Sequence, residues 1–356
     1  MEALGDVRTA SRSGELMRST RLVAICPLAL ALAAGAVLAT GVDAPARAAT
    51  PPYTFAVIGD VPYGQTAQNH FPVFIGGINA DPDVRMVTHL GDIKSGSVTC
   101  DDARFATIRR DFDTFTDPLV YTPGDNEWTD CHRADNGRYN PLERLAKVRS
   151  VFFPVAGSTL GRTPVTVTSQ ASSGFRENVR YVRAGVSFAT LHVVGSNNDL
   201  KPWTGLGLTS ATSAQKSEQT ARMNATIANL RAAFATARTQ SLRAVVLQQQ
   251  ADMFDMTVTS PSFSNYSAFK PLVQALIDES RAWGGPVYLF NGDSHRYRDD
   301  HPLVSGSKWL GFYGVTGTAA NVRRVVVDGD TLGEKDWLKV TVNPDATLAL
   351  RRVPGV

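Results

Sequence analysis

One stretch decides how the rest of the chain is interpreted, Tyr121-Thr122-Pro123-Gly124-Asp125-Asn126-Glu127-Trp128-Thr129-Asp130-Cys131. It continues the apolar residues 119–121 and interrupts them with Pro-Gly, after which two carboxylates and an amide follow within three positions. An apolar run that ends at a glycine and continues into an acidic loop is typical of strands in α/β sheets, whose carboxyl ends carry ligand and metal sites. The sequence therefore predicts a site where this strand ends.

The same pattern recurs elsewhere along the chain. Gly59-Asp60 follows the apolar run 53–58, Gly91-Asp92 follows 86–90, and Gly292-Asp293-Ser294-His295 follows 286–290. A further apolar run, 244–247, ends in Gln248-Gln249-Gln250-Ala251-Asp252. Runs that are apolar at nearly every position predict strands buried on both faces. We expect their polar ends to form one site, because the carboxyl ends of parallel strands share an edge.

Helices are expected between these strands, so the fold class is α/β. The predicted helices 71–79 and 103–114, the second capped by Asp101-Asp102, alternate with the first three strands and indicate a mainly parallel sheet. Periodicity predicts further helices at 141–149, 213–239 and 270–283, and strands at 179–182 and 186–195. Four C-terminal segments are expected to form an antiparallel second sheet: 309–313, 322–327, 337–342 and 347–352.

The domain organisation is expected to be a removed signal peptide followed by one domain. In residues 1–49, the apolar run 22–38 follows two arginines and precedes the cleavage pattern Ala46-Arg47-Ala48-Ala49. The alternative is an uncleaved membrane anchor, since the run is close to the shortest that spans a bilayer. Residues 50–356 are expected to form a single domain with an irregular insertion at about 150–183, rich in Gly, Ser, Thr and Pro. The expected location is secreted, periplasmic or in the cell envelope, with no membrane anchor after cleavage.

Cysteine usage and charge narrow the class of protein further. Cleavage would leave Cys100 and Cys131, and an even number of cysteines in an exported protein predicts one disulfide. A catalytic cysteine is the alternative, supported only by the neighbour His132. A net charge of +3 over 356 residues, without a block of Lys and Arg, gives no indication of a nucleic-acid partner.

The polar strand ends have the chemistry of a metal site. Gathered carboxylates repel one another unless protons or cations intervene. Carboxylate and amide oxygens around one imidazole form a hard, oxygen-rich site for divalent ions, and two such ions can promote displacement at phosphorus. The candidate ligands are Asp60, Asp92, Asp125, Gln250, Asp293 and His295.

In this order the motifs resemble those of the calcineurin-like metallophosphoesterases, which read D-x-H, G-D-x-x-D, G-N-H-[DE], a lone His after a strand, and G-H-x-H. The resemblance covers about residues 53–345 and implies an αββα sandwich of two mixed sheets. It also implies two metal ions and hydrolysis of a phosphate ester by metal-activated water. The ester would be a small-molecule or glycan phosphate.

Carried over residue by residue, the resemblance makes Asp60 a ligand of the first ion and Asp92 the ligand shared by both. Asp125 takes the place of the family's asparagine ligand. Gln250 takes the place of the lone His, with Gln248 and Gln249 as alternatives. In the last motif Asp293 replaces the first His, and His295 matches the second.

Departures from the family pattern change the expected chemistry. Pro62 replaces the His of the first motif, and Ser95 or Gly96 replaces the second acid of the next. Asn126 stands where the family has the His that protonates the leaving group, and an amide does not donate a proton in that role. The oxygen-rich ligand set favours Mn, Mg or Ca over Zn or Fe. The candidate catalytic residues are Asn126 and His295, and the candidate phosphate-binding residues are Asn126, Lys94, Tyr63 and Arg296.

Three functions are consistent with these residues. The first is a secreted metal-dependent phosphoesterase. The second is a catalytically weakened relative that binds metal or a phosphate ligand without turnover, which the loss of the acid His favours. The third is a structural envelope protein that keeps only the scaffold, against which the retained polar strand ends argue.

Overall fold

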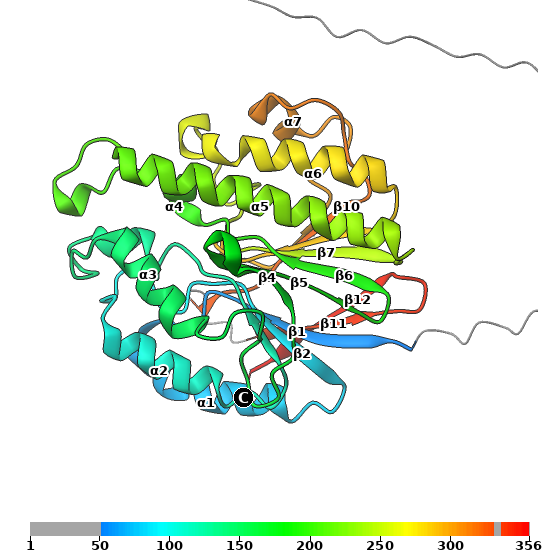
Figure 1. Cartoon of the computed structure of the whole chain (residues 1–356), viewed down its shortest axis with the longest axis horizontal. Helices are drawn as coiled ribbons and strands as arrows, with labels where there is room; N and C mark the ends of the chain where they lie inside the picture. The colour runs from blue at the N-terminus through cyan, green and yellow to red at the C-terminus, as the bar shows by residue number, and fades with distance from the viewer. Residues whose placement is uncertain (1–50, 331–335, 356) are drawn as a thin grey trace, which may run out of the picture. The chain divides into compact units, whose positions relative to one another are not determined.

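The computed structural model describes residues 51–330 and 336–355, and their strands form two sheets that lie face to face between helices (Figure 1). The five-stranded sheet has the order β12-β11-β1-β2-β3, and the seven-stranded sheet has the order β4-β5-β6-β7-β8-β10-β9. Each sheet contains both parallel and antiparallel neighbours. The predicted αββα arrangement of two mixed sheets is therefore confirmed.

The five-stranded sheet contains the first strands of the chain together with the last two. Its members are β1 (Tyr53–Ile58), β2 (Val84–His89), β3 (Leu119–Tyr121), β11 (Asp336–Val342) and β12 (Leu348–Pro354). Strands β1, β2 and β3 are parallel, and β11 runs antiparallel to β1. The outer face is covered by α1 (Gly64–Asn79), α2 (Asp102–Phe112) and α3 (Pro141–Phe152), which lie together on one side of the sandwich (Figure 1).

The seven-stranded sheet is built from the middle of the chain. Its members are β4 (Thr168–Gln170), β5 (Phe175–Arg183), β6 (Val186–Thr190), β7 (Ala244–Gln248), β8 (Val287–Asn291), β9 (Arg298–Asp300) and β10 (Val322–Val326). The long helices α5 (Ser213–Thr239) and α6 (Lys270–Trp283) cover its outer face (Figure 1). The remaining helical segments are α4 (Gly195–Asp199), α7 (Lys308–Tyr313) and the 3-10 turns 129–132, 171–173, 204–206, 263–265 and 267–269.

An apolar layer between the sheets fixes where the strand ends lie. Phe55 of β1 packs edge-to-face on Phe188 of β6 and on Phe290 of β8, with ring centroids 5.4 and 5.8 Å apart. Removal of this surface from water is the main favourable contribution to such packing. As a result the ends of β1 and β8 meet, and the backbone N–H of Asp293 donates to both carboxylate oxygens of Asp60 at 3.1 Å.

Two predictions about the C-terminal region were wrong. Residues 309–313 belong to helix α7, because the Ser307 side chain accepts a hydrogen bond from the backbone N–H of Trp309 and Gly314 ends the helix at φ 56°. The segment is rich in aromatic residues, which also favour strands. The later strands do not form a separate antiparallel sheet, since β10 pairs in parallel with β8 while β11 and β12 extend the first sheet.

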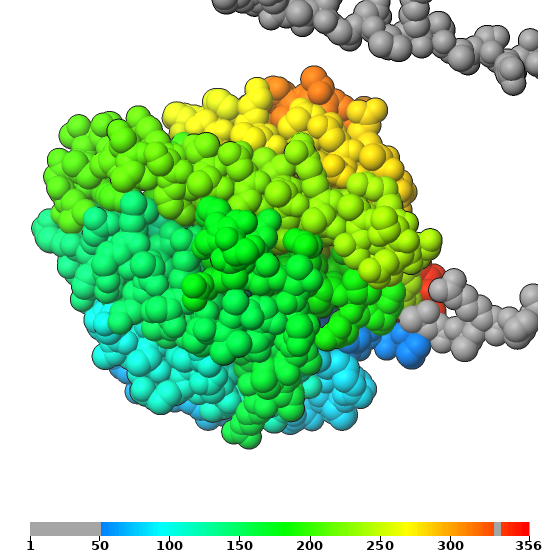
Figure 2. All heavy atoms as spheres, viewed as in Figure 1, coloured from blue at the N-terminus to red at the C-terminus, as the bar shows by residue number. Residues whose placement is uncertain are grey.

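Other boundaries differ from the prediction. Helix α1 begins at Gly64 rather than at residue 71, with Pro72 inside it. The insertion predicted at 150–183 is irregular only between residues 153 and 167, because β4 and β5 form the edge of the second sheet. Figure 2 shows this part of the chain, in green, on the surface between the two helical layers. The predicted signal peptide, residues 1–49, lies outside the described residues. Among the residues that are described, no helix is long and apolar enough to cross a membrane.

Candidate metal centre

The structure brings five of the predicted metal ligands together at the carboxyl ends of the strands. They form two groups of three residues. Within each group, every residue has one potential ligand atom that lies within 4.8 Å of those of the other two. The first group is Asp60, Asp92 and His295, and the second is Asp92, Asp125 and Asp293. Asp92 belongs to both groups, so its carboxylate lies where two neighbouring cations would share it.

At two of the Gly-Asp pairs, a side chain in place of the glycine would collide with a carboxylate of the cluster. A Cβ atom on Gly124 would collide with the carboxylate of Asp92 and lie 2.5 Å from its backbone nitrogen. A Cβ atom on Gly292 would collide in the same way with the carboxylate of Asp60. Gly124 and Gly292 thus make room for a carboxylate from the end of another strand, whereas a Cβ atom on Gly91 would meet the backbone of Gly124 and one on Gly59 would lie 3.1 Å from Leu90 Cβ.

Backbone strain is concentrated around the cluster. Non-glycine residues rarely adopt positive φ, and each instance costs about 1–3 kcal/mol, so such residues gather where function requires them. Twelve non-glycine residues of the described chain have positive φ. Four of them belong to the cluster, namely Asp60, Asp92, Asp293 and His295, and four are the successive residues 196–199 of the turn α4, whose Ser196 hydroxyl donates to Asp125.

The electrostatics of the cluster favour added positive charge. Burial, followed by the charge of Asp125, raises the pKa of Asp92 well above its ordinary value, and the same two causes raise the pKa of Asp293. Burial lowers the pKa of His295, but the hydrogen bond to Asp60 and the neighbouring carboxylates outweigh it and raise that pKa overall. Divalent cations remove this repulsion, and four carboxylates with one imidazole form a donor set that fits them.

Gln250 lies beside the cluster with its amide nitrogen directed at the carboxylates. Its Oε1 accepts a hydrogen bond from the Gly195 N–H at 2.7 Å, and its Nε2 donates to Asp92 at 3.1 Å and to Asp125 at 3.3 Å. In this orientation Gln250 is a hydrogen-bond donor to two of the candidate ligands. Gln248 donates instead to Thr88, and Gln249 donates to the backbone oxygen of Ala251.

Tyr63 and Asn126 face the cluster from an open cleft. The Tyr63 hydroxyl lies 3.1 Å from Asp92 Oδ2 and 3.3 Å from His295 Nε2, and it accepts from Asn126 Nδ2 at 3.0 Å. Asn126 Nδ2 also donates to Asp92 Oδ2 at 2.9 Å. Burial and the charge of Asp92 raise the pKa of Tyr63 well above its usual range, so its hydroxyl stays protonated. Ser95 and Gly96 complete the side of this cleft.

Neither of the two cations predicted to bind phosphate lines this cleft, and a third, Arg133, which the sequence analysis did not identify, lies beside it. Lys94 is fully buried, with its ammonium on the Ser95 carbonyl oxygen at 3.0 Å, and burial lowers its pKa to about 8. Arg296 is exposed, and its side chain makes no hydrogen bond or ion pair with any described residue. Arg133 instead pairs with Asp130 at 2.6 Å.

Arg133 reaches the side of the cleft where Asn126 lies. A Cβ atom on Gly96 would lie 3.2 Å from Arg133 Nη1 and 2.8 Å from Asn126 Oδ1, so both side chains converge on this glycine. The sequence signal was the i,i+3 spacing of Asp130 and Arg133, directly after the acidic stretch.

The loops that carry the cluster are joined covalently and by hydrogen bonds. The predicted disulfide between Cys100 and Cys131 is present, with Cα atoms 5.7 Å apart, and it links the loop after Asp92 to the loop after Asp125. The buried carboxylate of Glu127 accepts from the backbone N–H of Asp92 at 3.2 Å and of Gly124 at 2.6 Å. Glu127 therefore holds the loop that begins at Asp92 and the loop that begins at Gly124 in fixed positions.

Comparisons with known proteins show only a distant likeness. No protein-family model matches the sequence, and no curated protein is detectably similar to it. Among solved structures, GAP50, the anchor in the inner membrane complex of Plasmodium, superposes with a TM-score of 0.48 at 8% identity, over 86% of this chain and 85% of that one. Purple acid phosphatase PPD1 from yellow lupin (Lupinus luteus) seeds superposes with a TM-score of 0.46 at 12% identity, over 85% of this chain and 52% of that one. A likeness of this degree carries no conclusion about activity.

Proposed function

We propose that this protein is an exported metal-dependent phosphoesterase. The observation that carries the proposal is the position of Asp92, whose carboxylate belongs to two adjacent groups of potential ligands. A shared carboxylate between two cations is the arrangement that supports in-line displacement at phosphorus. Export is supported by the disulfide between Cys100 and Cys131, since such bonds persist in oxidising compartments.

The two groups divide the metal-binding roles. Asp60 and His295 would hold one cation and Asp125 and Asp293 the other, with Asp92 available to both. Mn, Mg or Ca suits this oxygen-rich set better than Zn or Fe. When bound, the cations supply charge neutralisation and a water of lowered pKa.

The chain's own side chains then orient the ester. The amide of Asn126 and the hydroxyl of Tyr63 lie at the open side of the cluster, and once cations neutralise Asp92 they would exchange their hydrogen bonds to its carboxylate for phosphate oxygens. Arg133, which pairs with Asp130, lies beside Asn126 on the same side. In the hydrolysis, water adds to phosphorus, the ester P–O bond breaks, and the proton from the water leaves with the alcohol. Because Asn126 cannot donate that proton, alcohols that depart easily as anions react fastest.

The substitution of an amide for an acid also supports a second candidate function, in which metal and phosphate bind without turnover. The Asn126 amide donates to Tyr63 and to Asp92, so it is held at the cluster as a positioning group that has no proton to transfer.

Hydrolysis of 4-nitrophenyl phosphate by Mn²⁺-loaded protein tests the first proposal. We expect activity that a chelator abolishes and that Asp92→Asn lowers by about 10³-fold or more, since the substitution removes the shared charge. The matched control is Asp135→Asn, an exposed carboxylate in the loop after Cys131, which should retain full activity. Equal activity of wild type and Asp92→Asn would contradict the proposal. Tight binding of inorganic phosphate without hydrolysis would favour the second function.

A further inference from the structure

A second cleft adjoins the cluster on the side of Asp125 and Asp293. Its volume is about 370 Å³, and both of these carboxylates line it. The helical turn α4 forms one side, and the segment from Asp255 to Phe269 forms another. A molecule in this cleft would therefore reach the second group of ligands at one end.

The turn beside the cluster is an unusual piece of backbone. Ser196, Asn197 and Asn198 have φ of 51, 54 and 53°, a left-handed conformation that costs each non-glycine residue about 1–2 kcal/mol. A Cβ atom on Gly195 would lie 2.5 Å from an Asp125 oxygen, and the Ser196 hydroxyl donates to Asp125 at 3.0 Å. The left-handed turn thus places this wall directly against a metal ligand, and the strain is offset by contacts around it.

Those contacts hold the cleft in a preformed shape. Asn197 Nδ2 donates to the carbonyl oxygen of Ser264 at 3.0 Å, and its Oδ1 accepts from the Ala268 N–H at 3.0 Å, which joins the turn to the opposite wall. The buried guanidinium of Arg222, on helix α5, donates to the Asn198 carbonyl oxygen of the turn at 3.2 Å. A preformed cleft binds with little loss of conformational entropy.

Several polar side chains along the cleft are not engaged with the protein. Within residues 51–330 and 336–355, no hydrogen bond or ion pair is made by the side chains of Lys201, Ser260, Asn265 or Tyr266. The Tyr266 ring is fixed by packing on Phe269 and Phe312, with centroids 6.1 and 5.8 Å away. Such groups are available to donate to and accept from a ligand.

The chemistry of these groups fits a polyhydroxylated ligand. Amide, hydroxyl and ammonium groups beside an aromatic ring can bond hydroxyls while the ring packs on the C–H face of a sugar. The charges do not favour a second anion, since Asp255 offsets Lys201 and Asp130 pairs with Arg133.

We propose that this cleft binds the alcohol part of the ester and selects a polyhydroxylated one, so that the substrate is a sugar or polyol phosphate. The inference rests on the proposed function for the position of the phosphate. It adds the class of alcohol, which the metal cluster alone does not specify.

Two matched pairs of esters test the inference on Mn²⁺-loaded protein. Glucose 6-phosphate is compared with cyclohexylmethyl phosphate, and glycerol 1-phosphate with propyl phosphate, so that each pair differs in hydroxyl groups while keeping a primary ester. We expect kcat/KM to be about tenfold or more higher for the hydroxylated member of at least one pair. Equal or lower values in both pairs would overturn the proposal.

Variants locate the selectivity in the cleft. Tyr266→Phe keeps the packed ring and removes only the hydroxyl, and Asn265→Ala removes only the free amide. Each should reduce the preference about threefold to tenfold without changing kcat/KM for the alkyl ester. The control Lys216→Met, an exposed lysine of α5 outside the cleft, should leave the preference unchanged, whereas Lys201→Met should lower it. A preference that persists in all cleft variants would contradict the assignment.

Failure of the proposed hydrolysis can be separated from failure of the subsite. If none of the esters is hydrolysed, the proposed activity is wrong, and the same esters then serve as ligands for calorimetry. Tighter Mn²⁺-dependent binding of the hydroxylated member, weakened by Tyr266→Phe, would still support the subsite. Equal binding within both pairs would remove it.

Discussion

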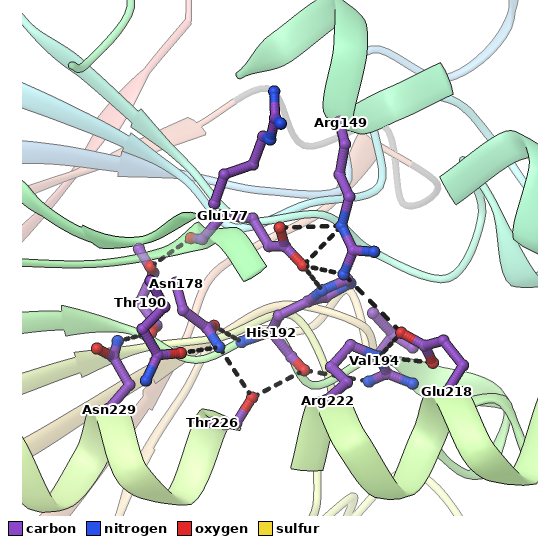
Figure 3. Close-up of polar contacts among 12 residues, drawn as sticks. Arg149, Glu177, Asn178, Thr190, His192, Val194, Glu218, Arg222, Thr226 and Asn229 are labelled. Carbon is purple, nitrogen blue, oxygen red and sulfur yellow. Dashed lines mark hydrogen bonds and ion pairs between the residues drawn. The ribbon is translucent and has the colours of Figure 1, made fainter. Parts of the chain in front are cut away.

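Among the described residues, the candidate metal cluster and a second buried cluster of charged groups treat charge in opposite ways. The metal cluster gathers carboxylates of one sign around Asp92, and their burial and mutual repulsion raise the pKa of that side chain. The second cluster, which we call the buried ion network, pairs Arg149 and His192 with Glu177 and pairs Arg222 with Glu218 (Figure 3).

In the buried ion network each charge has a partner. Both oxygens of Glu177 accept from Arg149 Nε at 3.1 Å, and Oε1 lies 2.8 Å from His192 Nδ1. Burial would raise the pKa of Glu177, but these partners outweigh it and lower that pKa to about 2. Burial lowers the pKa of His192 to about 4, so the imidazole is neutral. The network joins α3, β5 and α5, which gives it a structural role.

The difference indicates which cluster binds something else. Pairing inside the protein makes the network complete, whereas the metal cluster is incomplete without added cations. Arg222 links the two clusters. Its guanidinium lies 5.0 Å from the Trp128 ring and donates to a carbonyl oxygen of the turn α4, whose Ser196 hydroxyl in turn donates to Asp125. We infer that the balanced cluster supports the unbalanced one.

The largest expected effect comes from breaking the network. Glu177→Gln removes the charge that balances Arg149, and we expect a loss of about 3 kcal/mol in the free energy of unfolding at pH 7. Urea denaturation measures this loss. The matched control is Glu143→Gln, because the Glu143 side chain is half exposed and its partner Arg144 keeps a second ion pair with Asp102, so the loss should be less than about 1 kcal/mol. Similar losses in the two variants would show that the network is not a special source of stability.

A smaller effect is expected from crowding the metal cluster. Gly124→Ala forces the Asp92 carboxylate to move, and displaced ligands typically lower metal affinity by about 10- to 100-fold. Calorimetric titration with Mn²⁺ measures the change. Gly76→Ala, in a helix with open space around the added Cβ atom, should leave the affinity unaltered. Unchanged affinity in Gly124→Ala would remove this explanation of the Gly-Asp motif.

Relief of repulsion should stabilise the metal-free protein. Asp92→Asn removes a buried charge with a raised pKa, and we expect it to increase the free energy of unfolding at pH 7 by about 1–2 kcal/mol in chelator. The gain should disappear in excess Mn²⁺, which only the wild type binds tightly. A less stable variant in chelator would mean that the carboxylate is already balanced by the protein.

The two clusters should also respond to pH with opposite sign. The folded pKa values of Asp92 and Asp293 are raised, so their contribution is favourable below about pH 4 and is lost as the pH rises. The folded pKa values of Glu177 and His192 are lowered, so both residues contribute to the free energy of unfolding at neutral pH. The contribution of His192 is lost as the pH falls below about 6.5, and that of Glu177 as the pH falls below about 4.5.

Thermal unfolding across pH 4–8 in chelator separates these contributions. The advantage of an Asp92→Asn, Asp293→Asn double variant over wild type should grow by about 1 kcal/mol from pH 5 to 7. The disadvantage of Glu177→Gln should shrink as the pH falls toward 4. The same pH dependence in both variants would contradict the contrast between the clusters.

The sequence was sufficient for the parts of the site that local chemistry determines. Asp60, Asp92, Asp125 and Asp293 follow strands whose apolar runs are unambiguous, and parallel strands place such ends at one edge. The helices 213–239 and 270–283 were predicted to the residue; Thr212 caps the first, and Gly284 ends the second in the left-handed conformation.

What the sequence could not show depends on contacts between distant segments. The orientation of Gln250 follows from a hydrogen bond to Gly195, 55 residues away, and although Asn197 and Asn198 favour positive φ, three successive left-handed residues follow from contacts with distant segments. The burial of Lys94 and the position of Arg133 likewise depend on how the loops pack around Glu127 and Asp130. The helix at 308–313 was missed because its aromatic residues fit a strand equally well.

Metal content measured by mass spectrometry after chelation and reloading with Mn²⁺ tests the account most directly. We expect about two Mn²⁺ per chain in the wild type, fewer in Asp92→Asn, and the wild-type content in Asp135→Asn. Wild-type protein that retains no Mn²⁺ after reloading would contradict the account, since the gathered carboxylates would then have no cation to hold.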